Sequence, residues 1–161
     1  MAYMMTYELP RGTAALIEKD GALVRVAFVT EESELYDLAN EYEVRPGDGT
    51  VLEEARRELD EYFDERRKAF EVPLRAEGTP FQKAVWAELA RIPYGEYRSY
   101  KQIAEAVGDP KKARAVGQAC HVNPLPLFVP CHRVIASDGT LGGFGGGLEL
   151  KYYLLMLEGV I

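Results

Sequence analysis

Two short helices joined by a tight turn are predicted by the stretch SYKQIAEAVGDPKKARAVGQACH, residues 99–121. Its first four residues have the form of a capping box, in which Ser99 and Gln102 each satisfy a backbone N–H at the start of a helix. Gly108-Asp109-Pro110 makes the turn, and Asp109 is placed to cap a second helix from about Lys111 to His121. This outline is that of a helix-turn-helix, although it is also common in proteins that never bind DNA.

The second of these helices carries little side-chain bulk. Small residues stand at Ala113, Ala115, Gly117 and Ala119, so its backbone can closely approach a narrow surface such as the minor groove, roughly 6 Å wide. A glycine at position 117 lowers helix stability relative to alanine. Its presence in spite of this cost favours the interpretation that the helix backbone closely approaches another surface. The residues alone leave an alternative open, in which the alanines favour helix formation and pack against a neighbour.

The charge is unevenly distributed along the chain. A net charge of −7 argues at first against a nucleic-acid partner, because a polyanion is best met by a basic surface. However, residues 1–75 carry 10 Lys and Arg against 18 Asp and Glu, whereas residues 76–161 carry 9 against 8. Within 98–133 there are 6 Lys and Arg residues against 2 Asp and Glu residues. We therefore expect an acidic supporting half and a half that meets an anion, unless the clustering is only a solvated surface.

A thiol stands beside an imidazole at Cys131-His132, directly after the apolar run PLPLFVP at 124–130. Only the thiolate is a useful nucleophile, and a neighbouring base or cation is the usual means of forming one. The pair is a candidate reaction centre, and the alternative is a small buried residue next to a polar one. Two cysteines cannot form a disulfide framework, and a free thiol suits a reducing compartment. With no secretory signal and no membrane span in the sequence, we expect a cytoplasmic protein.

The first half is predicted to be a small sheet with helices. Asp20-Gly21 lies between two apolar runs as a hairpin turn, and apolar residues then alternate over 24–28. Residues 50–53 have the form of a capping box at the start of a helix that should run to about Arg67. Residues 71–78, with a proline inside and a glycine at the end, are expected to form an extended linker. We therefore predict a supporting α/β domain over 1–75 and a second domain over 76–161.

The second half is predicted to open with a capping box at 79–82 and a core-packed helix. Six of the fifteen glycines fall in 139–147, in a loop that exposes its backbone and leaves space, either lining a pocket for something flat with Phe144 as a wall or simply flexible. It matches no nucleotide-binding pattern. The final segment, 148–157, is apolar nearly all round, so we expect a buried helix that ends at Glu158, a carboxylate in need of a partner.

Several separate motifs, in matching order and spacing, resemble the O(6)-alkylguanine-DNA alkyltransferases, also called methylated-DNA-protein-cysteine methyltransferases. The resemblance extends from about Gly78 to Gly159, and the first half is similar only in size and in its plan of strands and helices. It implies an α/β (α+β) protein with a ribonuclease H-like N-terminal domain and a winged helix-turn-helix-like C-terminal domain. The motifs are IPYG at 92–95, Ser99-Tyr100, ARAVG at 113–117, Asn123-Pro124, PCHRV at 130–134 and GGL at 146–148.

The resemblance implies DNA repair by direct transfer, in which Cys131 attacks the alkyl carbon on O(6) of guanine, keeps the group and acts once. In the family a Glu–His–water–Cys chain relays the thiol proton, which maps here to Glu158, His132 and Cys131. Tyr100 corresponds to the tyrosine that donates toward the purine, and Asn123 to the hinge asparagine between the recognition helix and the active-site strand. The chemistry is consistent, because the departing base leaves readily only when it is protonated or hydrogen-bonded.

The resemblance also implies that the base is flipped out of double-stranded DNA from the minor groove, with Arg114 filling its space, since flipping loses stacking energy of the order of a few kcal/mol. No cofactor or metal is implied, and we expect a monomer. Other residues expected at the DNA are Ser99, Tyr100, Lys111, Lys112, Ala113, Gly117, Gln118 and Arg133. The base and alkyl pocket is expected to include Pro126, Val134, Gly142, Gly143, Phe144, Gly145 and Gly146.

The chain departs from the family pattern at Phe144-Gly145, where many relatives have Tyr-Ser or Tyr-Ala, and this predicts tolerance of larger alkyl groups. The zinc-binding cysteines of some relatives have no counterpart, and Cys120-His121 with Cys131-His132 is unlike known zinc sites. Two other functions remain open. A lesion-binding protein would flip the base without transfer, although such relatives lack the cysteine. A thiol hydrolase would need a base held across the site and an oxyanion hole.

Overall fold

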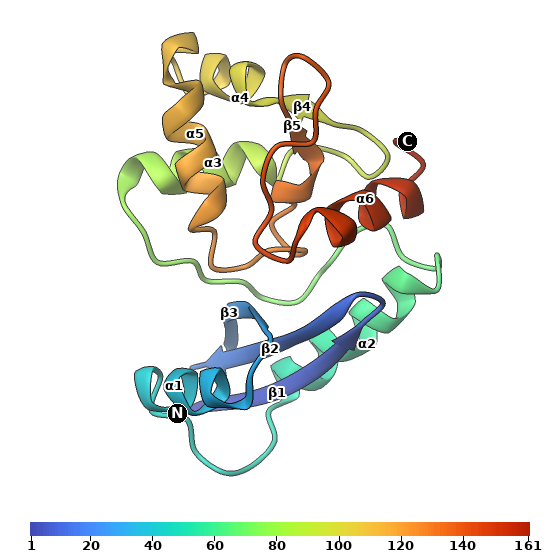
Figure 1. Ribbon diagram of the computed structural model, residues 1–161. Helices are drawn as coiled ribbons and strands as arrows, with labels where there is room; N and C mark the ends of the chain where they lie inside the picture. The colour runs from blue at the N-terminus through green and yellow to red at the C-terminus, as the bar shows by residue number, and fades with distance from the viewer. The chain divides into compact units, whose positions relative to one another are not determined.

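The computed structural model describes residues 1–161, and the chain divides into two compact units, Met1–Ala76 and Glu77–Ile161 (Figure 1). Both units mix helices with short strands, as expected for an α/β (α+β) protein. The N-terminal unit contains β1 (Ala2–Leu9), β2 (Gly12–Lys19), β3 (Ala22–Val29), α1 (Glu32–Glu41) and α2 (Thr50–Phe63). The C-terminal unit contains α3 (Pro80–Leu89), β4 (Arg98–Ser99), α4 (Tyr100–Ala106), η1 (Pro110–Lys112), α5 (Ala113–His121), η2 (Cys131–Arg133), β5 (Val134–Ile135) and α6 (Leu148–Leu157).

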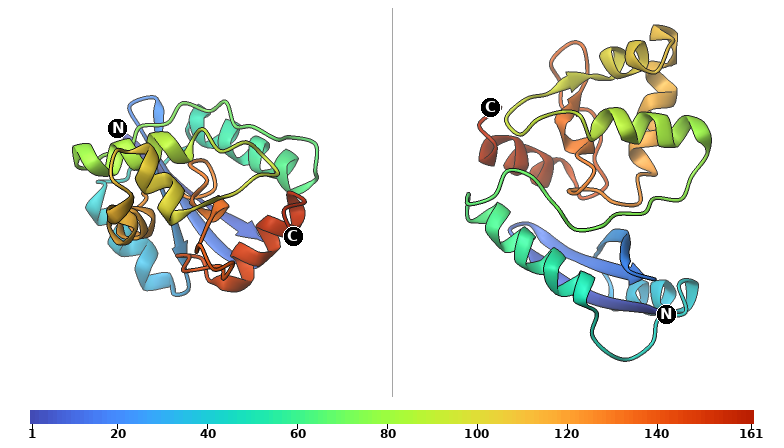
Figure 2. Two further views of the ribbon diagram at one scale, coloured as in Figure 1. Left: turned by 90° about the horizontal axis from the view of Figure 1, so that it is seen from above. Right: turned by 180° about the vertical axis from the view of Figure 1, so that it is seen from behind.

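The N-terminal sheet is antiparallel in the order β1-β2-β3, with β2 in the centre. The predicted hairpin turn is confirmed, since Asp20 and Gly21 have φ of 49° and 82°, the positive values that a two-residue turn requires. Five consecutive β2 residues, 14–18, are buried. Successive side chains of a strand point to opposite faces, so both faces of the sheet must be covered. Figures 1 and 2 show α1 and α2 on opposite faces.

The start of α2 differs from the sequence prediction. Gly49 is the N-cap, and no capping box forms with Glu53. Instead, the buried carboxylate of Glu18 accepts a hydrogen bond of 3.0 Å from the backbone N–H of Leu52. A Cβ atom at position 49 would collide with that carboxylate, so a glycine is required there by contact rather than by its φ. The helix also ends at Phe63, before the predicted Arg67.

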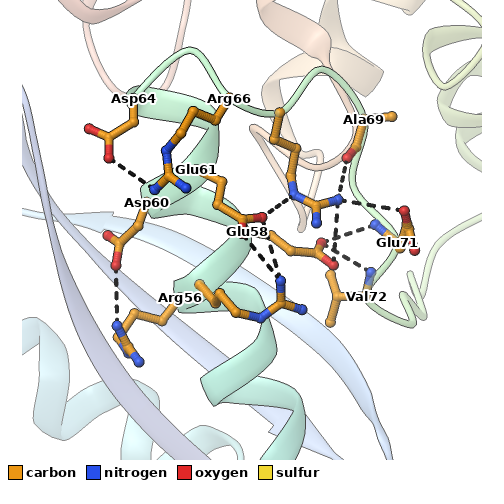
Figure 3. A network of polar contacts seen from close by, with 11 residues as sticks. Arg56, Glu58, Asp60, Glu61, Asp64, Arg66, Ala69, Glu71 and Val72 are labelled. Atoms are coloured by element: carbon orange, nitrogen blue, oxygen red, sulfur yellow. Dashed lines mark hydrogen bonds and ion pairs between the residues drawn. The ribbon is translucent and has the colours of Figure 1, made fainter.

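A second buried carboxylate, Glu58 of α2, holds the segment that follows the helix (Figure 3). It accepts hydrogen bonds from the backbone N–H groups of Glu71 and Val72, at 3.0 and 3.2 Å. Arg67 lies between Glu58 and Glu61, with Nε 2.8 Å from Glu61 Oε1. The first part of the predicted linker is therefore extended, as expected, but it is bound to the N-terminal unit rather than free.

The C-terminal unit begins as the sequence predicts. Thr79 caps α3 and Ser99 caps α4, each in a complete capping box, and Asp109 accepts from the N–H of Lys111 in the turn before α5. The turn is a 3-10 segment, so α5 starts at Ala113 rather than at Lys111. The indole of Trp86 in α3 donates to the carbonyl of Ala119 in α5 at 2.9 Å. This bond and the apolar contacts around it place α5 against α3.

The last helix, α6, is buried on one face only, contrary to the prediction. Leu150, Leu154 and Leu155 are buried together with one cation, Lys151. Leu148, Tyr152 and Met156, spaced by four residues, are each about half exposed. An apolar composition therefore overstated the burial of this helix. None of the helices in the chain has the length and apolar character needed to cross a membrane.

Candidate active site

The thiol of Cys131 lies at the start of η2, within a continuous buried stretch at 125–134. Asn123 holds the first half of this stretch, since its amide donates to the carbonyl of Val129 at 3.0 Å and its carbonyl oxygen accepts from the N–H of Leu125 at 3.0 Å. Burial raises the pKa of the Cys131 thiol, and a hydrogen bond from Asn123 opposes that rise. Asn123 thus connects α5 to the thiol and also favours its ionised form.

His132, the residue after the thiol, forms a buried pair with Glu158, with 2.8 Å between Nε2 and Oε2. Burial would raise the pKa of Glu158, but hydrogen bonds from His132 and Arg133 outweigh it and lower the pKa to about 2. Burial lowers the pKa of His132 in spite of the carboxylate. A neutral imidazole therefore donates from Nε2 to an ionised Glu158. Its Nδ1 atom is buried without a hydrogen-bond partner, which leaves it free to accept a proton.

The expectation that Arg133 contacts DNA does not agree with the structure. Arg133 is 7% exposed, and each of its three guanidinium nitrogens already donates inside the protein. Nε and Nη2 lie 2.7 and 3.0 Å from the two oxygens of Glu158, and Nη1 donates to the carbonyl of Ile92 at 2.7 Å. A bidentate guanidinium of this kind fixes the orientation of a carboxylate. Arg133 therefore positions Glu158 instead of binding a phosphate.

A pocket of about 710 Å³ opens beside the thiol. Its walls come from α4, α5, η2 and the glycine-rich loop. The ring of Phe144 meets His132 edge-on at the back of this wall, with 6.4 Å between ring centroids. Predicted site residues that line the pocket are Tyr100, Ala113, Arg114, Gly117, Gln118, Cys131, Gly142, Gly143, Phe144 and Gly145. Predicted residues outside its lining are Ser99, Lys111, Lys112, Asn123, Pro126, His132, Arg133, Val134, Gly146 and Glu158.

Tyr100 presents a protonated phenol to the pocket. Burial, with further contributions from the two nearby thiols, raises its pKa to about 12, so the phenol remains a hydrogen-bond donor at neutral pH. The glycine-rich loop lies directly against this ring. A Cβ atom at Gly142 would be 2.7 Å from the Tyr100 hydroxyl, and the φ of Gly142 is +72°. Glycine at 142 is therefore needed for both conformation and contact.

Sequence reasoning missed several residues of the pocket. Lys101, Cys120, His121, Ala136 and Ser137 also line it. Cys120 is a second thiol, but burial raises its pKa to about 12, so it remains neutral. Its place in the predicted recognition helix, one turn beyond Gly117, was a signal for this proximity. No group of three or more His, Cys, Asp or Glu side chains in the chain is arranged to hold a metal ion.

Exposed basic residues lie beside the mouth of the pocket. Arg114 lines it, and Lys111 and Lys112 are exposed in the turn before α5. The ammonium of Lys112 is 5.2 Å from the centroid of the Phe81 ring. Together with the slim helix α5, these cations form a surface suited to the phosphates of a nucleic acid.

A DNA-binding α+β protein with a thiol in the lining of a pocket is thus the class that the fold and site define, and known families agree with it. The ribonuclease-like domain model of 6-O-methylguanine DNA methyltransferase matches residues 2–76, and the DNA-binding domain model matches residues 80–160. The chain therefore belongs to the 6-O-methylguanine DNA methyltransferase family. The two models also confirm the expected plan of a ribonuclease-like domain followed by a DNA-binding domain.

Individual relatives are similar over nearly their whole length. The constitutive methylated-DNA–protein-cysteine methyltransferase of Bacillus subtilis is 45% identical over 159 residues, which cover 98% of this chain and 96% of the relative. That of Methanosarcina acetivorans is 43% identical and covers 98% of each. The crystal structure of the Mycobacterium tuberculosis protein in complex with DNA is 38% identical, with a TM-score of 0.86 over 98% of this chain and 92% of that one.

Proposed function

We propose that this protein repairs DNA by transferring an alkyl group from O(6) of guanine to Cys131, once per molecule. The observation that carries the proposal is the thiol in the wall of a pocket large enough to admit a purine, followed in the chain by a buried neutral imidazole that is paired with an ionised carboxylate. We assign the transfer to the C-terminal domain, residues 76–161, and a supporting role to residues 1–75. The names of the relatives agree with this reaction.

The transfer is an in-line displacement. A bond forms between Sγ of Cys131 and the alkyl carbon, the bond from that carbon to O(6) breaks, and its electron pair remains on the purine. The thiol proton passes toward Nδ1 of His132, through a water molecule in the relay that the family implies, and Glu158 stabilises the resulting imidazolium. Tyr100, which is protonated at neutral pH, donates its proton to the departing purine, and the proton taken up by His132 returns through solvent to restore the phenol. The products are a thioether and an unmodified guanine.

The same geometry explains why the thiol needs this relay. Burial raises the pKa of Cys131, so little free thiolate exists before the substrate arrives. A neutral base beside the thiol removes the proton only as the carbon–sulfur bond forms. The buried carboxylate supplies the compensating charge without solvent reorganisation. Reactivity is thus restricted to a carbon that is already held in the pocket.

Access to a base in duplex DNA requires that the nucleotide leave the stack. We propose that α5 enters the minor groove, that the exposed Arg114 fills the space left by the flipped nucleotide, and that Lys111 and Lys112 bind phosphates. Removing either lysine should weaken binding at all sequences and reduce its salt dependence. We further propose that the protein acts as a monomer in the cytoplasm. Sedimentation of the DNA complex and microscopy of a tagged chain test these two points.

Intact-mass measurement after incubation with duplex DNA containing O(6)-methylguanine tests the reaction. The wild type should gain one methyl group, mapped by peptide analysis to Cys131, and excess damaged DNA should add no second one. Cys131→Ala should gain none, whereas the matched variant Cys120→Ala should still gain one, since the thiol of Cys120 lacks the relay. Repaired DNA with an unchanged protein mass would favour a hydrolase, and tight binding without transfer would favour a lesion-binding protein.

A further inference from the structure

Lys151 is a buried cation that the reaction described above does not use. It is the one basic residue of α6, and its side chain is 0% exposed. Its ammonium donates to three backbone carbonyls, those of Val134 at 2.7 Å, Gly143 at 3.2 Å and Leu141. An ammonium has three protons, so every donor is used. A lysine is rarely buried to this degree without a carboxylate, which indicates a specific role.

The three carbonyls belong to two segments that form the reaction centre. Val134 lies in β5, three residues after the thiol, whereas Leu141 and Gly143 lie in the glycine-rich loop that lines the pocket. Between them, Gly142 lies directly against Tyr100. A single ammonium group therefore ties the wall of the pocket to the strand that directly follows the nucleophile.

The charge of Lys151 also acts on its surroundings. Burial lowers its pKa to about 8, although the thiols of Cys131 and Cys120 oppose this shift. In return, Lys151 lowers the pKa of Cys131. The other titratable groups that face it are Tyr100, whose ring centroid is 5.8 Å from Nζ, and His132. At neutral pH the group is thus mainly protonated and able to hold all three carbonyls.

We propose that Lys151 is a positioning residue for alkyl transfer, which holds the glycine-rich loop against the active-site strand so that the alkyl carbon is presented to Cys131. The inference rests on the proposed function and adds to it a device that links the last helix to the pocket. It acts on the transfer step. Binding of DNA through Arg114 and the lysines of η1 does not depend on it.

Single-turnover transfer from saturating O(6)-methylguanine duplex, with DNA affinity measured separately by fluorescence anisotropy, tests the proposal. Lys151→Met keeps the length of the side chain and removes its donors. A misplacement of the reacting atoms by about 1 Å lowers a rate about 100-fold, so we expect a loss of that size with affinity changed less than about twofold. Lys83→Met, which removes an exposed lysine from α3, is the matched control and should transfer at the wild-type rate.

The pH dependence of the wild-type transfer rate is a second test, because a lysine with a purely structural role would not change it. A neutral amine has two protons and directs its lone pair at a carbonyl, so the transfer rate should fall as pH rises through about 8. A thiol that merely needed deprotonation would give a rise instead. In Lys151→Arg the guanidinium remains charged throughout this range, so the fall should disappear.

The outcomes separate the two proposals. A wild-type rate that is flat or rising between about pH 7 and about pH 9, at constant DNA affinity, overturns the role of Lys151 even if its variants do not fold. Transfer by a folded Lys151→Met protein within about threefold of wild type overturns it as well. If the wild type itself gains no alkyl group, the proposed function fails and this inference fails with it.

Discussion

Replacing Glu158 with glutamine is expected to destabilise the C-terminal unit strongly. The substitution keeps the shape of the side chain but removes its charge. Glu158 is fully buried at the side chain and is bound by His132 at 2.8 Å and by Arg133 at 2.7 Å. In Glu158→Gln the guanidinium of Arg133 remains inside the protein without a carboxylate, and one of the amide's donors would face it.

Two estimates of the magnitude agree. Removing one partner of a buried ion pair costs about 3–5 kcal/mol. Independently, burial would raise the pKa of Glu158, but the hydrogen bonds from His132 and Arg133 lower it from 4.5 to about 2, a difference worth about 3 kcal/mol. Because the pKa is depressed in the folded state, this stabilisation is fully present above about pH 4.5 and is lost as pH falls toward 2.

Denaturant unfolding followed by tryptophan fluorescence reports on the C-terminal unit, because Trp86 is the only tryptophan of the chain and is buried in α3 of that unit. At pH 7 Glu158→Gln should lose about 3–5 kcal/mol, and the difference from wild type should shrink at about pH 3. Glu88→Gln, which breaks a surface pair with Arg91, should lose less than about 1 kcal/mol. A Glu158→Gln protein within about 1 kcal/mol of wild type at pH 7 would refute the reasoning.

Three further substitutions test contacts at glycines. Gly142→Ala should destabilise the C-terminal unit by about 1–3 kcal/mol, measured by the same fluorescence, because the methyl group meets Tyr100 at a φ of +72°. Gly49→Ala should displace the carboxylate of Glu18 from the first turn of α2 and accelerate hydrogen exchange of the amide that it binds. Gly145→Ser should narrow the pocket and lower the ratio of benzyl to methyl transfer rates about 10-fold.

Each of these has a contrary outcome. Gly143→Ala is the control for the first, since nothing lies within 4 Å of a Cβ atom there, and equal losses in the two variants would contradict the contact argument. An unchanged hydrogen-exchange rate of the Leu52 amide in Gly49→Ala would mean that the Glu18 carboxylate does not hold the first turn of α2. Equal rate ratios in Gly145→Ser and wild type would end the hypothesis of a wider alkyl pocket.

Most features that depend on neighbouring residues were predicted correctly from the sequence, the capping box at 50–53 being the exception. The capping boxes at Thr79 and Ser99, the cap at Asp109 and the hairpin turn at 20–21 each form as expected. A cap or a tight turn involves residues within one turn of the chain, so its energetics are already present in the local sequence. The adjacent thiol and imidazole at 131–132 indicated a candidate reaction centre from neighbouring residues in the same way.

Features that join distant residues were decided by the tertiary structure. The amide of Leu52 is capped by Glu18, 34 residues earlier, although Thr50 and Glu53 have the pattern of a local capping box. Arg133 is a basic residue in the basic segment 98–133, as expected of a DNA contact, but its guanidinium is bound inside the protein by Glu158. Local sequence patterns specify which groups a side chain is able to bind. The packing of helices and strands then decides which of those groups lies near enough to be bound. Packing outweighs the local preference because burying an unpaired charge or N–H group costs more free energy than that preference supplies.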